Sequence, residues 1–284
     1  MAEQPAGFSH DELITLIRQE LADGVFTVPL LPHTASEVLA SSLEEDSDAQ
    51  RLADLIEKDQ SLATQVLRVV NSPAFRGSAE IVALRQAIAR LGMDRMREIA
   101  LSVSVKGTVF KGGAHEAMLT SVWSQALSAG LWAKEIARRA RKNVELAYLA
   151  GLLHTIGVPV LVNRAVELDA SVTPAALETL LDTLTMEAGQ AVVAAWHLPP
   201  IVGECMACAG AFEEADAPDL VAVNEAGQQV ASHMADSETA AVDEEDVQEF
   251  LGEDAFQHLN FYPDDVAELL ALAGQIETTV ESLR

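Results

Sequence analysis

The stretch GLLHTIG, residues 151–157, contains the side chain best suited to chemistry, His154. An imidazole followed directly by a carboxylate can supply two ligands to a divalent cation. Such a cation polarises a phosphate and turns water into a nucleophile at neutral pH. Here the next residue is Thr155, whose neutral hydroxyl is a weak replacement for a carboxylate. The stretch therefore suggests metal-assisted phosphoester hydrolysis but lacks a ligand that this chemistry needs.

A second pattern with chemical potential is the CxxC of Cys205 and Cys208, a spacing found in zinc and redox sites. The sequence has no second cysteine pair and no alternation of strands and helices around this one. On a helix the two positions share a face, so we interpret them as small apolar residues of the interior. An intermolecular zinc site or disulfide is the alternative.

The elements that must position these residues have helical periodicity, in segments 9–21, 47–59, 61–75, 83–110, 121–140, 145–157, 173–199 and 262–283. Ser9 and Ser47 each open a capping box, and Pro263 begins the last segment. Gly92 divides segment 83–110 into two helices, and Asp94 is expected to cap the second. We find no strand pattern and predict an all-α protein of two packed helical lobes.

Gly112 and Gly113 mark the best internal boundary, because they follow an apolar run and precede a new helical stretch. We predict an N-terminal extension over residues 1–28 and a helical bundle over 29–111. A second helical lobe over 112–284 is expected to end in acidic helices.

Composition limits the class of protein. The chain has 284 residues, of which 49% are hydrophobic, 22% charged and 5% aromatic, as in a folded helical protein. The N-terminus lacks the pattern of a signal peptide, and no stretch approaches the ~18 uninterrupted apolar residues of a membrane span. Two cysteines form no disulfide framework. We expect a cytoplasmic protein without a membrane partner.

Charge is distributed unevenly. Residues 165–284 carry 25 acidic side chains and one basic side chain, whereas residues 51–142 carry 15 basic and 8 acidic ones. The acidic part would repel a phosphate backbone, so we expect no nucleic-acid binding. The basic segment forms either a solvated helix face or a surface that meets an anionic partner, such as a nucleotide or an acidic protein.

Five segments occur in a characteristic order: LPHTASEVL, IEKDQSLATQVLRVVNSPAF, IVALRQAIARLG, YLAGLLHTIG and AAWHLPPIV. The most specific part is DxxLxxxxLxxxNS, from Asp59 to Ser72, followed by AIxxLG at 87–92. From about Pro29 to about Ala226 the chain resembles the HDOD family, the HD-related output domains of bacterial signalling proteins.

This resemblance implies an N-terminal helical bundle joined to a lobe similar to HD-type phosphohydrolases. It also implies a role in signal transduction, downstream of a sensor or receiver, without an established enzymatic activity. About 28 residues precede the match and hold no receiver domain. We therefore expect the input to arrive from another chain, from a ligand or through the level of expression.

The resemblance also assigns the positions where an HD hydrolase holds its metal ligands. In this chain they are Gln125, the pair His154-Thr155, Thr185, Ala209 and, near the last acidic position, Glu225. One histidine and one glutamate are too few to chelate a catalytic ion. We therefore expect no metal, no cofactor and no catalytic residue.

His154 keeps two interpretations. It is either a core histidine that is hydrogen-bonded to a neighbour, or part of a relic pocket with Gln125, Thr155 and Glu225. Such a pocket would bind a small ligand without turning it over.

Asn71 and Arg76 are the candidate partner-binding residues. They lie in NSPAFRG, which ends a helix within the basic segment. The alternative is that Asn71 caps or bridges helices and that Pro73 and Gly77 shape a turn.

The sequence favours a non-catalytic bacterial signalling module that binds a sensor kinase, a response regulator, a nucleotide cyclase or a second copy of itself. The alternative is a metal-dependent phosphohydrolase or phosphodiesterase acting on a nucleotide or cyclic dinucleotide. A third hypothesis is a sensor that binds a nucleotide in the relic pocket without hydrolysing it.

Overall fold

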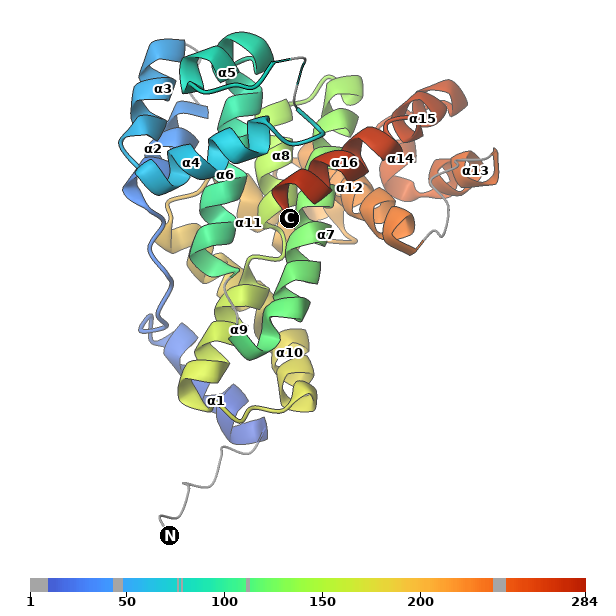
Figure 1. The fold of residues 1–284 in the computed structure, drawn as a ribbon. Helices are drawn as coiled ribbons and strands as arrows, with labels where there is room; N and C mark the ends of the chain where they lie inside the picture. The colour runs from blue at the N-terminus through green and yellow to red at the C-terminus, as the bar shows by residue number, and fades with distance from the viewer. Residues whose placement is uncertain (1–9, 43–47, 76, 78, 111–112, 237–243) are drawn as a thin grey trace.

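The computed structural model describes residues 10–42, 48–75, 77, 79–110, 113–236 and 244–284. Over these ranges the chain forms helices and no strand, which confirms the predicted all-α fold. Figure 1 shows a first bundle, α2 to α6, beside a second group of helices around α7.

The first lobe consists of helices that pack around α6. They are α2 (His33–Ser42), α3 (Ala49–Glu57), α4 (Gln60–Val70), α5 (Leu84–Leu91) and α6 (Met93–Val109). Two aspartates begin helices here, because Asp48 accepts a bond from the backbone N–H of Gln50 and Asp59 one from Leu62, each at 3.0 Å. These caps fix where α3 and α4 begin, and each helix buries an apolar face.

The junction between α5 and α6 differs from the prediction. Gly92 ends α5 as expected, and its φ of 84° explains why a glycine is needed there. The prediction that Asp94 caps α6 is wrong, because Asp94 lies in the first turn and accepts a bond from Arg97 at 2.8 Å. The caps predicted at Ser9 and Ser47 lie outside the described residues.

The second lobe is built around α7 (Glu116–Ala140), which follows the short 3-10 helix η1 (Gly113–His115). Its other helices are α8 (Val144–Leu153), α9 (Gly157–Leu168), α10 (Pro174–Ala195), α11 (Pro200–Ala207) and α12 (Pro218–Asp236), with η2 (Phe212–Glu214) before α12. Helix α7 packs against α8 and α12, and α9 packs against α10. Helix α1 (His10–Ala22) precedes the first lobe in sequence but packs on α10, and Glu20 pairs with Arg164 of α9 (Figure 1).

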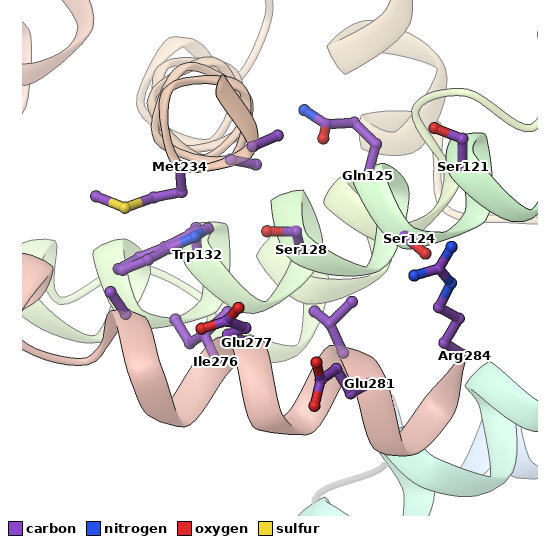
Figure 2. Close-up of a pocket in the computed structure, with 14 residues that line it drawn as sticks. Ser121, Ser124, Gln125, Ser128, Trp132, Met234, Ile276, Glu277, Glu281 and Arg284 are labelled. Carbon is purple, nitrogen blue, oxygen red and sulfur yellow. The ribbon is translucent and has the colours of Figure 1, made fainter. Parts of the chain in front are cut away.

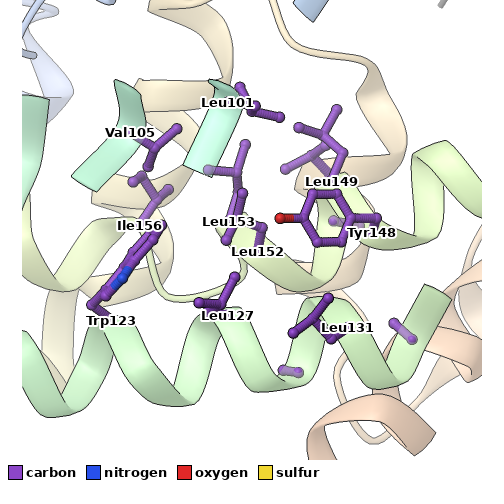
Figure 3. Packing of buried hydrophobic residues seen from close by; sticks show 14 of the residues in the cluster. Leu101, Val105, Trp123, Leu127, Leu131, Tyr148, Leu149, Leu152, Leu153 and Ile156 are labelled. Atoms are coloured by element: carbon purple, nitrogen blue, oxygen red, sulfur yellow. The ribbon is translucent and has the colours of Figure 1, made fainter. Parts of the chain in front are cut away.

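Glycines bring α7 very close to its two neighbours. A Cβ on Gly151 of α8 would lie 2.6 Å from the Cα of Gly130 in α7. A Cβ on Gly227 of α12 would lie 2.7 Å from the backbone nitrogen of Ala133. Only glycine permits this approach. Figure 3 shows the resulting core, in which Leu127 and Leu131 of α7 lie beside side chains of α8.

The last four helices are α13 (Glu244–Gly252), α14 (Asp254–His258), α15 (Pro263–Leu270) and α16 (Ala273–Leu283). Pro263 begins α15 as predicted, but the prediction of one helix over 262–283 is wrong. The chain turns at Ala271 and Leu272, which lets α15 pack against α13 while α16 packs along α7 (Figure 1). The end of α16 is held by Trp123, whose Nε1 donates to the carbonyl of Leu283 at 3.1 Å.

Polar contacts join the two lobes in the interior. Lys134 of α7 is buried and pairs with Glu98 of α6. The hydroxyls of Ser102 in α6 and Tyr148 in α8 lie 2.6 Å apart. Burial lowers the pKa of Lys134, and the Glu98 carboxylate opposes this effect. The junction between the lobes is therefore a specific polar contact as well as an apolar one.

Residues Val144–Leu168, which form α8 and α9, are long and apolar enough to cross a membrane by length and composition, with a mean hydropathy of 1.6. However, 67% of the most apolar window in this segment is buried inside the fold. The helix also breaks between Leu153 and Gly157. A pair of core helices in a soluble fold gives the same pattern, so the segment is weak support for a membrane span.

Candidate functional site

His154 lies at the end of α8, where a backbone carbonyl fixes its ring. Its Nδ1 is 2.6 Å from the carbonyl oxygen of Gly151. Because a carbonyl only accepts, Nδ1 donates, and Nε2 of the neutral ring is left as an acceptor. Burial lowers the pKa of His154, and the bond to Gly151 opposes this effect. At neutral pH His154 is therefore an uncharged imidazole.

The residues at the neighbouring ligand positions are neutral alcohols. The Oγ1 atom of Thr155 is buried and has no hydrogen-bond partner among the described residues. Thr185 of α10 donates its hydroxyl to the carbonyl of Leu181 at 2.7 Å, within its own helix. Neither side chain adds negative charge beside His154, and a divalent cation requires such charge.

His154 opens onto a cavity of about 370 Å³. Helices α10, α11 and α12 complete this His154 cavity with side chains that include Thr185, Met186, Cys205, Met206 and Gln228. Asp182 and Glu187 also line it, and none of the described lining residues is a lysine or arginine. A phosphate group bound here would meet carboxylates and no fixed cation.

Gln125 does not share this cavity. It lies on α7 and lines a separate groove between α7, α12 and α16 (Figure 2). The prediction of one relic pocket with Gln125 and His154 is therefore wrong. Leu127, which faces α8 (Figure 3), is two residues further along α7, or about 200° around the helix. This rotation directs Gln125 away from the end of α8.

Glu225 is also engaged outside the His154 cavity, because its Oε2 accepts the backbone N–H of Gly210 at 3.1 Å. Its neighbour Asn224, which is 1% exposed, is not among the residues predicted from the sequence. Gln228, which lines the cavity, donates to Oδ1 of Asn224 at 2.7 Å. Within the part of the chain that the structure describes, Nδ2 of Asn224 has no partner. The i,i+4 spacing of these two amides on an apolar helix was the signal that could have identified them.

The CxxC pair does not form a thiolate site. Cys205 is 2% exposed and Cys208 half-buried, and neither is in a disulfide. Burial raises the pKa of Cys205 to about 12, so its thiol stays protonated at neutral pH. Zinc binds the thiolate form. Cys205 therefore agrees with the interpretation as a small interior residue.

The side chains around His154 do not fit a divalent metal ion. In the described ranges, no group of three or more His, Cys, Asp or Glu side chains could hold a metal. An HD-type site needs several imidazole and carboxylate ligands around the ion. The described residues around His154 therefore do not supply the ligands that an HD-type metal site needs.

Asn71 has a structural role. Its Nδ2 donates to the carbonyls of Leu67 and Ile81 at 2.9 and 2.8 Å, and its Oδ1 accepts from the N–H of Ile81 at 2.9 Å. The side chain thus connects the end of α4 to the loop before α5. This is the alternative in which Asn71 bridges helices. Arg76 lies outside the described residues.

Solved structures share this fold. An HDOD domain protein of unknown function from Geobacter sulfurreducens is 22% identical, with a TM-score of 0.72 that covers 97% of this chain and 99% of that one. A protein from Shewanella amazonensis SB2B, provisionally named a phosphohydrolase, is 21% identical with a TM-score of 0.70, covering 94% and 98%. A provisionally named signal transduction protein from Marinobacter aquaeolei VT8 is 19% identical with a TM-score of 0.61, covering 96% and 66%.

Sequence comparison gives the family. An uncharacterized protein of Treponema pallidum (strain Nichols) is 26% identical over an alignment of 201 residues, and the match covers 66% of this chain and 39% of the longer relative. The family model of the HDOD domain matches residues 28–212, close to the span of the motifs. The matched residues include the bundle α2 to α6 and the turn at His154. The chain therefore belongs to the HDOD domain family.

Proposed function

We propose that this HDOD protein is a signalling module that acts by binding another protein and does not hydrolyse a phosphate ester. The observation that carries the proposal is the chemistry around His154. A single neutral imidazole is followed by an unpartnered threonine hydroxyl, where an HD hydrolase needs a carboxylate.

The charge of the His154 cavity supports the same proposal. Without a metal ion, binding the phosphate groups of a nucleotide or cyclic dinucleotide requires cationic side chains in the site. The described lining of this cavity has Asp182 and Glu187 instead. The same charge argues against a nucleotide sensor at this position. The phosphohydrolase remains the alternative that the experiment must exclude.

Metal content tests the non-catalytic part of the proposal. The purified protein is incubated with Mn²⁺, Fe²⁺ or Zn²⁺, desalted, and analysed by mass spectrometry for metal together with an assay on bis(p-nitrophenyl) phosphate and a cyclic dinucleotide. We expect substoichiometric metal and no turnover. Thr155→Asp is also expected to bind no metal, because one added carboxylate leaves the ligand set incomplete. One ion per chain that is lost in His154→Ala, or turnover that is lost in that variant, would contradict the proposal.

Partner binding is tested by cross-linking in native lysate, with mass spectrometry of the captured proteins. We expect a sensor kinase, a response regulator or a nucleotide cyclase, or a second copy of the chain. Arg76→Glu is expected to lose the partner, because it reverses a charge in the basic segment 51–142. Arg18→Glu, an exposed residue of α1, is the matched control. Equal capture by both variants would place the contact elsewhere.

A further inference from the structure

A groove of about 470 Å³ lies between α7, α12 and α16 (Figure 2). We call it the α16 groove, because α16 forms one of its walls. Its volume is in the range of roughly 300–1,000 Å³ that ligand sites have. The groove is separate from the His154 cavity and contains none of the residues that carry the proposed function.

The floor of the α16 groove offers free hydrogen-bonding groups. Gln125 and Ser128 of α7 are half-buried and line the groove, and their side chains make no hydrogen bond to any described residue. Figure 2 shows Ser128 between α12 and α16, with Gln125 further along α7 on the side of α12. An amide and a hydroxyl can each donate and accept. A ligand with its own donors and acceptors would satisfy them.

The α16 wall carries opposite charges at its two ends. Glu277 and Glu281 line the groove, and Arg284 lies at its far end beside Ser124 (Figure 2). None of the three charged side chains forms an ion pair with a described residue. Glu277 and Arg284 are seven residues apart, which corresponds to about 10 Å along a helix. The wall therefore presents the Glu277 carboxylate and the Arg284 guanidinium, with the Glu281 carboxylate between them.

The end of the groove at Glu277 is apolar. Trp132 of α7, Met234 of α12 and Ile276 of α16 meet there (Figure 2). At the opposite end, around Arg284, the lining includes the hydroxyls of Ser121 and Ser124. An aliphatic group is thus favoured near the negative site, and a small polar group near the positive one.

We propose that the α16 groove binds a short peptide with free ends, about three residues long. Three extended residues span about 10 Å, which matches the distance between the charged sites. The peptide places its ammonium group at Glu277, an aliphatic first side chain against Trp132 and Met234, and its carboxylate at Arg284. Its backbone amides meet Gln125 and Ser128. A single amino acid is too short to reach both charges.

Such a ligand would act where the lobes meet. The carbonyl of Leu283, at the end of α16, accepts bonds from Trp123 of α7 at 3.1 Å and from Lys106 of α6 at 3.3 Å. Helix α16 therefore touches both lobes next to the bound carboxylate. This inference goes beyond the proposed function, because it gives the module a ligand as an input.

Isothermal titration calorimetry at low salt with the peptide Leu-Ala-Ala tests the proposal. We expect saturable binding of one peptide per chain. N-acetylation is expected to weaken it about fivefold and C-terminal amidation by a similar factor, since each removes one partly exposed ion pair. Ala-Ala-Leu is expected to bind more weakly, because its leucine would lie among serines.

Variants connect each end of the peptide with its site. Glu277→Gln is expected to bind the free and the N-acetylated peptide alike, and Arg284→Gln the free and the amidated peptide alike. Glu268→Gln, at an exposed position of α15, is the matched control for net charge and keeps full affinity. Ser128→Phe fills the groove without changing charge and should abolish binding, with circular dichroism to check folding.

Absence of saturable heat with Leu-Ala-Ala would overturn the proposal. So would equal affinity for free and blocked peptides in the unmodified protein, or equal weakening by Glu277→Gln and Glu268→Gln. None of these outcomes depends on metal binding or on the capture of a protein partner, so they leave the proposed function untouched.

Discussion

His154 owes its properties to its position at the end of α8, where its ring is half-buried. The carbonyl of Gly151 holds one ring nitrogen, and burial disfavours the imidazolium. The neutral ring keeps Nε2 as a hydrogen-bond acceptor and carries no charge at neutral pH. The consequence is a measurable dependence of stability on pH.

We expect acid to destabilise the protein through His154. Because the folded pKa is lowered, the unfolded chain takes up this proton first as the pH falls below about 6.5. The free energy of unfolding should therefore decrease between pH 7.5 and pH 5.5, and His154→Gln should lose less over the same interval. Urea titrations at both pH values measure the free energy of unfolding. The variant His33→Gln, at an exposed position, is the control. Parallel losses in the unmodified protein and in His154→Gln would contradict the expectation.

The types of residue near His154 could be predicted from the sequence, whereas the directions in which their side chains point could not. Thr155 is visible as a neutral residue beside His154 without any structure. The match of its position to a family ligand predicts Gln125 in the same pocket. Its direction depends on which face of α7 packs on α8, and this is a property of the packed lobe. Asn224 was missed for the same reason.

Among the helices, glycine contacts set the distances that position the His154 turn. A Cβ on Gly157, the first residue of α9, would overlap the carbonyl oxygen of Thr185 in α10. The Cβ is fixed to the backbone of α9, and the carbonyl belongs to the backbone of α10. The overlap can therefore be relieved only by moving one helix. At Gly203 in α11, a Cβ would meet the amide of Gln190 at 2.8 Å, which is the end of a flexible side chain.

These two glycines give a matched pair of substitutions. Gly157→Ala is expected to lower the free energy of unfolding by about 3 kcal/mol, as overpacking against backbone does. Gly203→Ala should change it by less than about 1 kcal/mol, since the gain in helix propensity offsets a small side-chain shift. Chemical denaturation of both variants gives the comparison. A loss of less than about 1 kcal/mol for Gly157→Ala would show that the contact at Gly157 does not fix α9 on α10.

Predicted and observed helix boundaries agree where a proline or glycine marks the boundary in the sequence. Pro263 begins α15, and Gly92 ends α5. The division of segment 262–283 into α15 and α16 had no such signal, because Ala271 and Leu272 suit a helix interior. The turn there is imposed by two different packing partners, α13 and α7. Tertiary contacts decided this boundary.

In the whole molecule, the pair of Lys134 and Glu98 connects the lobes inside the core. Arg95 also contacts Glu98, at 3.3 Å. A buried ammonium without its carboxylate is costly, while replacing both charges with neutral groups is often well tolerated. Each charge of the pair therefore offsets the cost of burying the other.

A double-mutant cycle measures this compensation. Glu98→Gln alone is expected to destabilise by about 3 kcal/mol, because Lys134 stays buried without its partner. The double variant Glu98→Gln and Lys134→Met should be more stable than Glu98→Gln. Thermal or denaturant unfolding of all four proteins gives the coupling energy. Additive effects of the two substitutions would mean that the charges do not depend on each other.

The indole of Trp123 supplies an optical reporter within the fold. Its N–H is bonded to Leu283 and its ring centroid lies 5.1 Å from that of Phe110, the residue directly after α6. Indole emission shifts to longer wavelength when water replaces such neighbours. In a background where Trp132 and Trp196 are phenylalanine, fluorescence of this one side chain would follow detachment of the last helix in real time, without a label.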